Sequence, residues 1–394
     1  MKILIAHNKY KTPGGEDSVF QDEKKLLESN GNEIIQYVRS NDEIISKSLL
    51  LTSVQTVWNQ SSYKEIQGIL DSEKPDVIHV HNFFPIISPA IFYAAKSKGI
   101  PVVQTLHNYR LWCLNAYFFR EGGVCEDCKG QPFMLPGIKH QCYRGSLGAS
   151  AVLATMLSVH RALPTWDNVD IFIVLSQFAY DKFAEYGLPT EKMRLKPNFV
   201  ASLPLLGNEL DNSVLYIGRL SPEKGINTLI SAWDQLGDRI TLKIAGSGPM
   251  QEQVKAAARK NAGIQFLGQQ PKEKIYELLG QTKALIFPSL WYEGMPRTII
   301  EAFSVGKPVI ASNLGAMATM IDPGRTGLHF EPGNVDDLVK QVLWMLDHPS
   351  EWQAMGNQAR QEFEQNYTAE RNYEMLMDIY QQAIDSKRAS SIDG

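Results

Sequence analysis

Two glutamates, Glu293 and Glu301, lie at the start of a predicted helix. Pro296 suits the first turn of that helix, which leaves Glu293 in the preceding loop and Glu301 in the second turn. Open backbone N–H groups at a helix start attract phosphate or sugar oxygens, and Gly294 allows a ligand close to the backbone. The two carboxylates are therefore placed to accept hydrogen bonds from hydroxyls of one extended ligand. The alternative interpretation is that both only complement the charge of the helix.

A second candidate segment, from Gly218 to Gly225, carries two kinds of cation between a predicted strand and a predicted helix. Arg219 offers a fork of N–H donors, and Lys224 offers a compact positive charge. This combination suits a pyrophosphate. The alternative is an exposed turn whose charges are merely solvated.

The four cysteines fall in one short segment, with the spacing Cys113-x11-Cys125-x2-Cys128-x13-Cys142. In a cytosolic protein this pattern predicts a structural zinc site, and His140 is a possible substitute ligand. The alternatives are reduced thiols in an inserted loop, or an adventitious disulfide.

The elements that must position these residues alternate between short β-branched runs and helix-length segments, a pattern typical of parallel sheets. Residues 197–212 lack periodicity and mark the predicted linker. We expect an α/β protein of two doubly wound Rossmann-like domains facing a central cleft. The predicted strands are residues 2–6, 76–80, 101–106, 171–175, 214–217, 241–245, 264–267, 284–287 and 308–311.

The predicted domains are residues 1–204, with a cysteine-bearing insertion at about 111–145, and residues 205–372. Residues 373–394 are expected to form a C-terminal helix that packs back toward the first domain. Small, charged and histidine residues follow the predicted strands at one end of each sheet, where open parallel sheets bind ligands. The examples in the first half are His7, His79, His81 and His107.

Composition excludes several classes of function. The chain of 394 residues is 44% hydrophobic and has a net charge of −4, which argues against a nucleic-acid partner. The sequence from Met1 shows no signal peptide, and it contains no apolar run of about 18 residues that would span a membrane. We therefore expect a cytoplasmic protein.

Together these motifs resemble those of glycosyltransferase family 4, over most of the chain. The glutamate pair, the Gly218–Gly225 segment, Gly246-Ser247-Gly248-Pro249 and Lys307-Pro308-Val309-Ile310-Ala311-Ser312 occur in the family's order, and Gly14-Gly15 resembles its N-terminal glycine motif. The resemblance implies the GT-B fold and transfer of a sugar from a nucleotide sugar with retention of configuration. It also implies that catalysis requires no cofactor.

The resemblance implies a role for each matching residue. Arg219 and Lys224 would bind the donor diphosphate, Glu293 the transferred sugar and Glu301 the ribose, while His107 would lie beside the reacting sugar. Many family members have His-Asp where this chain has His107-Asn108, so an adjacent carboxylate is missing; many also have Phe in place of Met295. The remaining donor-binding residues implied are Gly14, Gly15, Gly246, Gly268, Gly294, Met295 and Pro296.

Donor and acceptor are less constrained by the sequence. Family frequency favours UDP-glucose, with a GDP-sugar as the rival. The segment from His107 into the cysteine-bearing insertion looks like that of bacterial polysaccharide-building transferases, which implies a saccharide or lipid-linked acceptor. Residues 145–163, near Lys139, Arg144 and Arg161, are weakly amphipathic and allow peripheral membrane contact, but an ordinary core helix is the favoured interpretation. The alternatives are an epimerase or hydrolase of the same fold and, ranked lower, a non-catalytic zinc-binding module.

Overall fold

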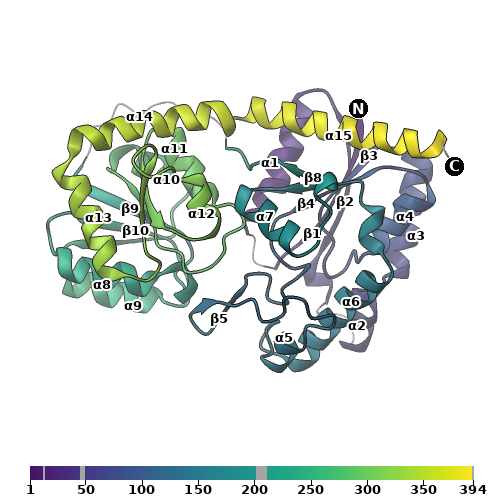
Figure 1. The fold of residues 1–394 in the computed structure, drawn as a ribbon, viewed down its shortest axis with the longest axis horizontal. Coiled ribbons are helices and arrows are strands. Elements are labelled where there is room, and N and C mark those ends of the chain that lie inside the picture. The colour runs from purple at the N-terminus through teal and green to yellow at the C-terminus, as the bar shows by residue number, and fades with distance from the viewer. Residues whose placement is uncertain (12–13, 45–48, 201–210, 393–394) are drawn as a thin grey trace. The chain divides into compact units, whose positions relative to one another are not determined.

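The computed structural model describes residues 1–11, 14–44, 49–200 and 211–392 (Figure 1). The chain forms two compact units. Unit 1 contains Met1–Tyr117, Glu126–Lys196 and the residues from Tyr373 onward; unit 2 contains Phe118–Cys125 and Pro197–Asn372. The predicted boundary between residues 204 and 205, and most of the predicted linker, lie outside the described residues.

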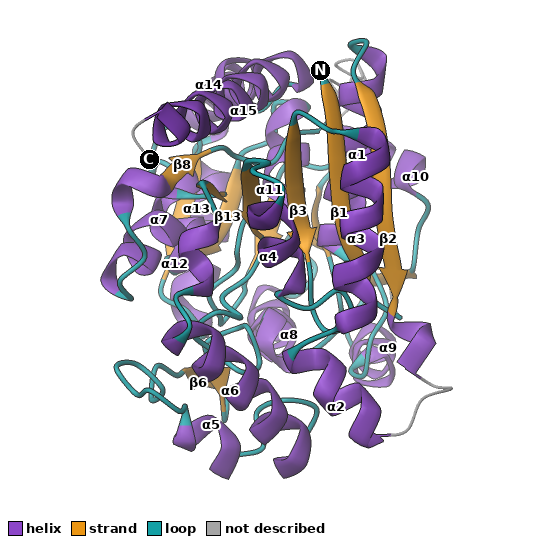
Figure 2. Cartoon of the chain, turned by 90° about the vertical axis from the view of Figure 1, so that its right-hand side faces the viewer, coloured by secondary structure: helices purple, strands orange, loops and turns teal. Residues whose placement is uncertain are grey.

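Unit 1 is built on six parallel strands in the order β2-β1-β3-β4-β7-β8. Figure 2 shows β2, β1 and β3 side by side. The inner strands are buried along most of their length, as expected for a sheet covered on both faces. The strands are β1 (Lys2–Lys9), β2 (Glu33–Ser40), β3 (Val77–Asn82), β4 (Val102–Leu106), β7 (Ile171–Val174) and β8 (Met193–Leu195).

The helices of unit 1 follow the strands in the usual alternating pattern. The C-terminal helix α15 begins in unit 2 and packs on unit 1, where the Tyr380 hydroxyl lies 2.7 Å from Nδ1 of His79. The α-helices are α1 (Gly15–Ser29), α2 (Leu49–Val57), α3 (Gln60–Glu73), α4 (Ala90–Ser97), α5 (Leu135–Lys139), α6 (Leu147–Ala162), α7 (Gln177–Glu185) and α15 (Ala369–Ile392); the 3-10 turns are η1 (Asn41–Ile44), η2 (Thr165–Asn168) and η3 (Thr190–Lys192).

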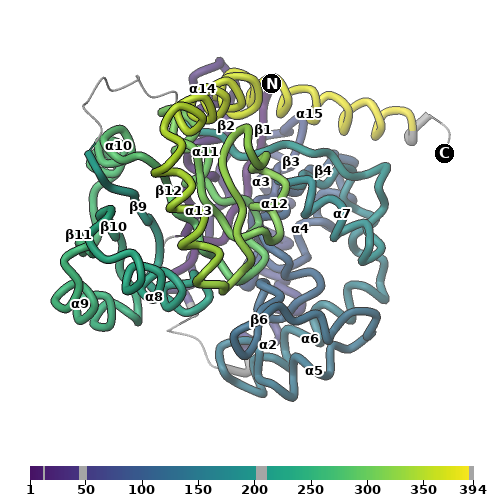
Figure 3. The backbone as a smooth tube through the Cα atoms, turned by 60° about the vertical axis from the view of Figure 1, so that its left-hand side comes forward, coloured from purple at the N-terminus to yellow at the C-terminus, as the bar shows by residue number. Residues whose placement is uncertain are grey.

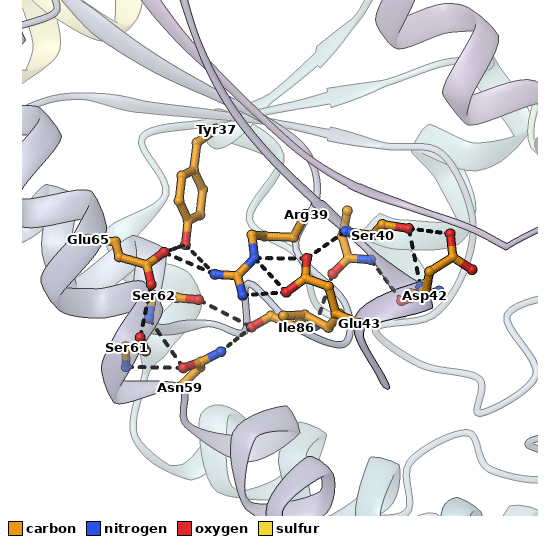
Figure 4. Close-up of polar contacts among 12 residues, drawn as sticks. Tyr37, Arg39, Ser40, Asp42, Glu43, Asn59, Ser61, Ser62, Glu65 and Ile86 are labelled. Carbon is orange, nitrogen blue, oxygen red and sulfur yellow. Dashed lines mark hydrogen bonds and ion pairs between the residues drawn. The ribbon is translucent and has the colours of Figure 1, made fainter. Parts of the chain in front are cut away.

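A polar network fastens the exit of β2 to helix α3 (Figure 4). Arg39 donates to Glu43 and, over 2.9 Å, to Glu65, which also accepts from the Tyr37 hydroxyl. Asn59 caps α3 by accepting from the amides at its first turn, and its amide donates to the carbonyl of Ile86 at 2.6 Å. The network fixes the loops at the carboxyl end of the sheet, where the candidate residues lie.

Unit 2 is a second six-stranded parallel sheet, in the order β11-β10-β9-β12-β13-β14 (Figure 3). Its core includes Trp233 of helix α8 (Ile226–Leu236), which is fully buried. The strands of the sheet are β9 (Ser213–Ile217), β10 (Thr241–Ala245), β11 (Ile264–Gly268), β12 (Leu285–Phe287), β13 (Val309–Ser312) and β14 (Gly327–Phe330). A separate small hairpin consists of β5 (Phe119–Arg120) and β6 (Gly123–Val124).

The helices of unit 2 are η4 (Pro222–Lys224), α8, α9 (Gln251–Lys260), α10 (Lys272–Gln281), α11 (Arg297–Ser304), α12 (Gly315–Met320), α13 (Val335–Asp347) and α14 (Pro349–Asn366).

The predicted fold class is confirmed, since each unit is a doubly wound parallel sheet. The nine predicted strands are present with ends shifted by at most three residues. The sequence analysis missed β2, β8 and β14 and the two short strands of the hairpin, β5 and β6. In the described part of the chain, no helix is both long and apolar enough to cross a bilayer.

Candidate functional site

The strand order of unit 2 reverses between β9 and β12, which are neighbours in the sheet although β10 and β11 separate them in sequence. Doubly wound sheets bind ligands at such a switch point, outside the carboxyl ends of the strands. The loops that follow these two strands are residues 218–225 and 288–296. They carry both candidate motifs of the second half.

Lys224 and Glu293 meet at this switch point. The Lys224 ammonium lies 2.6 Å from Oε1 of Glu293, and the two side chains are 20% and 10% exposed. The same oxygen accepts from the Ser289 hydroxyl at 2.5 Å and from the Trp291 indole N–H at 2.6 Å. The Lys224 ammonium also lies 5.0 Å from the centre of the Trp291 ring. The pair is thus held in a defined geometry and still reaches solvent.

Backbone hydrogen bonds and close packing tie the glycine-rich loops together. The amide of Leu220 donates to the carbonyl of Ser247, and that of Leu290 donates to Glu223. A Cβ atom on Gly225 would lie 1.9 Å from the carbonyl oxygen of Pro288, and one on Gly246 would lie 1.9 Å from that of Gly218. Both glycines have positive φ. No larger residue fits either position without moving the loops.

The remaining candidate residues of unit 2 surround the same edge. Arg219 is exposed on the loop after β9, and its carbonyl accepts from the Tyr216 hydroxyl at 2.8 Å. Gly268 ends β11, and its carbonyl accepts from the Gly246 amide at 2.8 Å. Glu301 lies half-buried in the second turn of α11.

The start of α11 differs slightly from the prediction. Pro296 is the N-cap, and the first helical residue is Arg297. Gly294 is half-buried in the loop before it, and Met295 is buried, with its sulfur 3.0 Å from the amide of Asn198. Because a capping proline contributes no N–H, the orphan donors of this helix start come from the residues that follow it.

In unit 1 the strand order reverses between β1 and β3. Four histidines lie on or after the strands at this point: His7, His79, His81 and His107. Nδ1 of His81 lies 3.1 Å from Nε2 of His107, and Nε2 of His7 lies 2.9 Å from Oδ1 of Asp17. Burial lowers the pKa of His107 and holds those of His79 and His81 well below the ordinary value. These three imidazoles are therefore neutral at pH 7.

A small hollow in unit 1 is lined by His107 together with Glu16 and Arg110. Asn108 donates to Oε1 of Glu16 across it. The Arg110 guanidinium lies 4.9 Å from the centre of the Phe84 ring, and its Nε is buried without a hydrogen bond. The hollow thus combines apolar walls with polar groups able to bind a hydroxyl-rich ligand.

An ion pair that the sequence analysis missed lies behind these histidines. The ammonium of Lys196 is 2.5 Å from Oε1 of Glu23, and both side chains are essentially inaccessible. Oε2 of Glu23 lies 3.3 Å from Nε2 of His81. The missed signal is the position of Glu23 on the otherwise apolar face of α1, between Phe20 and Leu27.

Glu23, His79 and His81 have ligand atoms within 4.8 Å of one another, which raises the question of a metal. Two observations weigh against a cation here. The Lys196 ammonium already neutralises Glu23. Both ring nitrogens of His79 have partners, the Tyr380 hydroxyl at 2.7 Å and the Thr105 hydroxyl at 2.8 Å. This cluster is therefore better described as a hydrogen-bonded network than as a metal site.

The predicted zinc site at the four cysteines stays a prediction. Among the residues that the structure describes, Glu23, His79 and His81 are the one group of His, Cys, Asp or Glu side chains with three or more ligand atoms within 4.8 Å of one another, and no cysteine belongs to it. The Cys113 thiol lies 2.9 Å from Oδ1 of Asn115, and the amide of Cys125 is bonded to the carbonyl of Phe118 at the hairpin β5–β6.

Gly14 and Gly15 lie exposed at the start of α1. Gly14 is the N-cap, and its amide donates to Oδ2 of Asp17 at 2.8 Å. A Cβ atom at Gly15 would meet nothing within 4 Å, so packing within the protein does not require glycine there.

Two family profiles match the sequence. The profile of Glycosyltransferase Family 4 matches residues 41–202, and that of Glycosyl transferases group 1 matches residues 205–362. The chain is 28% identical over 310 residues to glycogen synthase of Mycobacterium tuberculosis, a match that covers 74% of this chain and 64% of the relative. The chain thus spans less than two thirds of that protein.

Solved structures show the same fold. The structure of HepE from Anabaena in complex with UDP matches with a TM-score of 0.66 at 18% identity, over 99% of this chain and 100% of that one. Sucrose-phosphate synthase from Thermosynechococcus elongatus matches with a TM-score of 0.70 at 17% identity, over 98% and 99%. With two matched profiles over most of its length, this chain belongs to glycosyltransferase group 1/family 4 and has the GT-B fold.

Proposed function

We propose that this chain is a retaining glycosyltransferase that transfers a hexose, glucose from UDP-glucose, to a saccharide or lipid-linked saccharide acceptor. The observation that carries the proposal is the Lys224–Glu293 pair at the switch point of unit 2, held 2.6 Å apart with both side chains within reach of solvent. A cation for a diphosphate and a carboxylate for sugar hydroxyls are thereby placed side by side.

In the proposed mechanism, unit 2 binds the donor. Lys224 and Arg219 bind the diphosphate and offset the negative charge that develops as it leaves. Glu293 accepts hydrogen bonds from hydroxyls of the transferred sugar, and Glu301 accepts them from the ribose. Backbone N–H groups around Gly294 and the start of α11 hold the remaining phosphate and sugar oxygens. The loops at Gly246 and Gly268 lie beside the nucleotide.

The transfer itself occurs on one face of the sugar. The bond from the anomeric carbon to the diphosphate breaks, the acceptor hydroxyl oxygen bonds to the same face, and the departing phosphate takes the hydroxyl proton. His107 contacts the transferred sugar, and Gly14 and Gly15 approach the donor phosphate or the acceptor. We propose that this chemistry needs no metal, because the two cations of unit 2 supply the positive charge that a metal supplies elsewhere.

UDP is the favoured nucleotide. The HepE structures are described as complexes with UDP, with UDP and glucose, and with UDP-glucose. Their likeness to this chain supports a uridine donor here, and a GDP-sugar is the rival. A screen of nucleotide sugars for release of UDP or GDP tests the proposal. Release that accelerates with an added saccharide acceptor supports transfer, whereas isomerisation of the sugar without an acceptor indicates an epimerase, and acceptor-independent release indicates a hydrolase.

A membrane-bound acceptor is supported by one exposed surface of unit 1. Helices α2, α5 and α6 lie together (Figure 2), and α6 buries one face against the unit. Leu135 and Leu147 are 60% and 57% exposed there, near Lys139 and Arg144. Apolar side chains beside basic ones suit an anionic membrane surface. We propose that this surface contacts a membrane from its cytoplasmic side.

Metal analysis of protein purified without chelator tests the zinc alternative. The geometry of the thiols predicts a zinc content far below one per chain. Zinc near one per chain would show that Cys113, Cys125, Cys128 and Cys142 rearrange to bind it, and would support the structural zinc site predicted from the sequence.

A further inference from the structure

A chain of four side chains in close polar contact runs from the interior of unit 1 to the hollow. Lys196 contacts Oε1 of Glu23 at 2.5 Å, and Oε2 of Glu23 lies 3.3 Å from Nε2 of His81. Nδ1 of His81 in turn lies 3.1 Å from Nε2 of His107. The two imidazole rings are 5.3 Å apart between centres and inclined by 18°, the geometry of rings that share a hydrogen bond edge to edge.

The charges along this chain are well defined. Burial alone would raise the pKa of the Glu23 carboxyl, but the positive charge of Lys196 outweighs it, and the pKa lies below its ordinary value. Glu23 is therefore ionised at pH 7, and both of its oxygens can only accept hydrogen bonds. His81 and His107 are neutral because burial lowers the pKa of each. Each ring then carries a single N–H.

These facts fix which nitrogen of each ring is protonated. Oε2 of Glu23 makes no hydrogen bond of standard geometry, but at 3.3 Å it would repel a lone pair on Nε2 of His81, so Nε2 carries the proton and Nδ1 can only accept. Nε2 of His107 must then be the donor, which leaves Nδ1 of His107 with its lone pair. We propose that Glu23 is a positioning residue that, through His81, holds His107 in the Nε2–H tautomer and so presents Nδ1 as a hydrogen-bond acceptor for a carbohydrate hydroxyl. The last step rests on the proposed function.

A purely structural role for Glu23 predicts something different. If the ion pair only held α1 on the sheet, replacing Oε2 of Glu23 by an amide nitrogen would not change the tautomer of His107. In Glu23→Gln, Lys196 donates to the remaining amide oxygen, which turns the amide nitrogen toward His81. Nε2 of His81 must then accept, its Nδ1 becomes the donor, and His107 changes to the Nδ1–H form. The substitution inverts the whole chain of hydrogen bonds.

Long-range ¹H–¹⁵N spectra of protein labelled at histidine distinguish the two tautomers directly, with His107 assigned from a His107→Asn spectrum. We expect Nε2–H for His107 in the wild type and Nδ1–H in Glu23→Gln. His160 is the internal control: its Nε2 lies 2.7 Å from the carbonyl oxygen of Val57 and must be protonated in both proteins. An Nδ1–H form of His107 in the wild type, or an unchanged tautomer in the variant, would overturn the proposal.

Glu23→Gln leaves Lys196 buried beside a neutral amide, which destabilises the fold. His81→Phe keeps the ion pair and removes the connection, so it serves as the second variant. Its folding is checked by circular dichroism. In this variant the N–H of His107 loses its acceptor, and we expect the exclusive Nε2–H signature to disappear. A spectrum of His107 identical to that of the wild type would refute the role of His81.

Turnover gives a separate measurement. If His107 accepts from the transferred sugar, Glu23→Gln should lower kcat about 10- to 100-fold, the range seen when the partner that orients a functional histidine is removed. The dissociation constant for UDP should not change. An inverted tautomer with unchanged kcat would contradict the contact to the carbohydrate. Absence of nucleotide-sugar turnover in the wild type would refute the proposed function and leave the spectroscopic result intact.

Discussion

The switch points of the two sheets hold opposite kinds of polar site. In unit 1 the ion pair between Lys196 and Glu23 is sealed from solvent and surrounded by neutral histidines. In unit 2 the pair between Lys224 and Glu293 is 20% and 10% exposed and lies among glycine-rich loops. An ion pair sealed from solvent can only orient the groups around it. In an ion pair that solvent reaches, each side chain can also give up its contact with the other and bind a ligand instead. The same strand edge thus serves as a scaffold in one unit and as a candidate binding edge in the other.

Acidification should have the largest effect, and it should destabilise unit 1 more than unit 2, because the polar network of unit 1 depends on neutral histidines. The folded pKa values of His79, His81 and His107 are depressed, so the unfolded chain takes up protons that the native state does not. Stability therefore falls as the pH drops below the unfolded value of about 6.5, by up to about 1.4 kcal/mol per histidine and per pH unit. The carboxyl of Glu23 has a lowered pKa and stays ionised to lower pH, so its contribution to stability is lost only there.

Hydrogen exchange by mass spectrometry, corrected for the intrinsic effect of pH, measures this loss strand by strand. We expect β3 and β4 to lose protection between pH 6.5 and 5 while β9 and β12 keep theirs. Equal loss in both sheets would show that the histidine network does not set the acid stability of unit 1.

Removal of either member of the Lys224–Glu293 pair should have the next largest effect. Lys224→Ala and Glu293→Ala should each lower turnover about 10²- to 10³-fold, the range for losing one preorganised group that stabilises developing charge. Because the two side chains contact each other, the double variant should lose less than the product of the single losses. Steady-state kinetics of nucleotide release measures all three. Lys255→Ala removes an equal charge from the surface of α9 and should leave turnover unchanged. Normal turnover in both single variants would contradict the assignment.

The packing of the glycine loops can be tested within unit 2. Gly246→Ala places a methyl group 1.9 Å from the Gly218 carbonyl, and we expect a loss of about 3 kcal/mol in the free energy of unfolding. Gly237 also has positive φ but has open space around it, so Gly237→Ala should cost only about 1 kcal/mol. Urea denaturation of both variants gives the difference. Equal costs would mean that backbone conformation alone, and not the close approach of the loops, requires glycine at Gly246.

The smallest effect is expected at the exposed surface of unit 1. Leu135→Asp should weaken binding to anionic lipid vesicles about tenfold, since it replaces buried apolar area by a charge that the lipid repels. Leu195→Asp alters a leucine exposed elsewhere on unit 1 and should have no effect. Vesicle co-sedimentation measures both. Wild-type protein that does not sediment with vesicles would refute the membrane contact.

The inner strands of each six-stranded sheet were predictable, whereas most of the edge strands were not. Strands β1, β3, β4 and β7 read as short, mostly apolar runs because both of their faces are buried. The strands missed in these two sheets, β2, β8 and β14, each lie at an edge, whereas the edge strand β11 was predicted. In β2 only Tyr37 is buried, so the sequence there shows neither a continuous apolar run nor strict alternation.

A similar contrast holds for the candidate sites. The motifs of unit 2 each lie within one strand–loop–helix segment, so their residue types and spacing were visible in sequence, and the contact between Lys224 and Glu293 follows from the strand order. Glu23 and Lys196 are 173 positions apart and become partners only through the fold. The cysteine pattern stays a prediction, since close spacing in sequence does not by itself show how a fold arranges four thiols.

The central claim is that the loops after β9 and β12 bind a nucleotide diphosphate. Isothermal titration of UDP into the wild type, Lys224→Ala and the surface control Lys255→Ala tests it most directly. We predict saturable binding to the wild type and the control, and affinity at least about tenfold weaker in Lys224→Ala, as expected for losing a charge-assisted hydrogen bond. Equal affinity in all three proteins, or no binding of UDP or GDP to the wild type, would contradict the account.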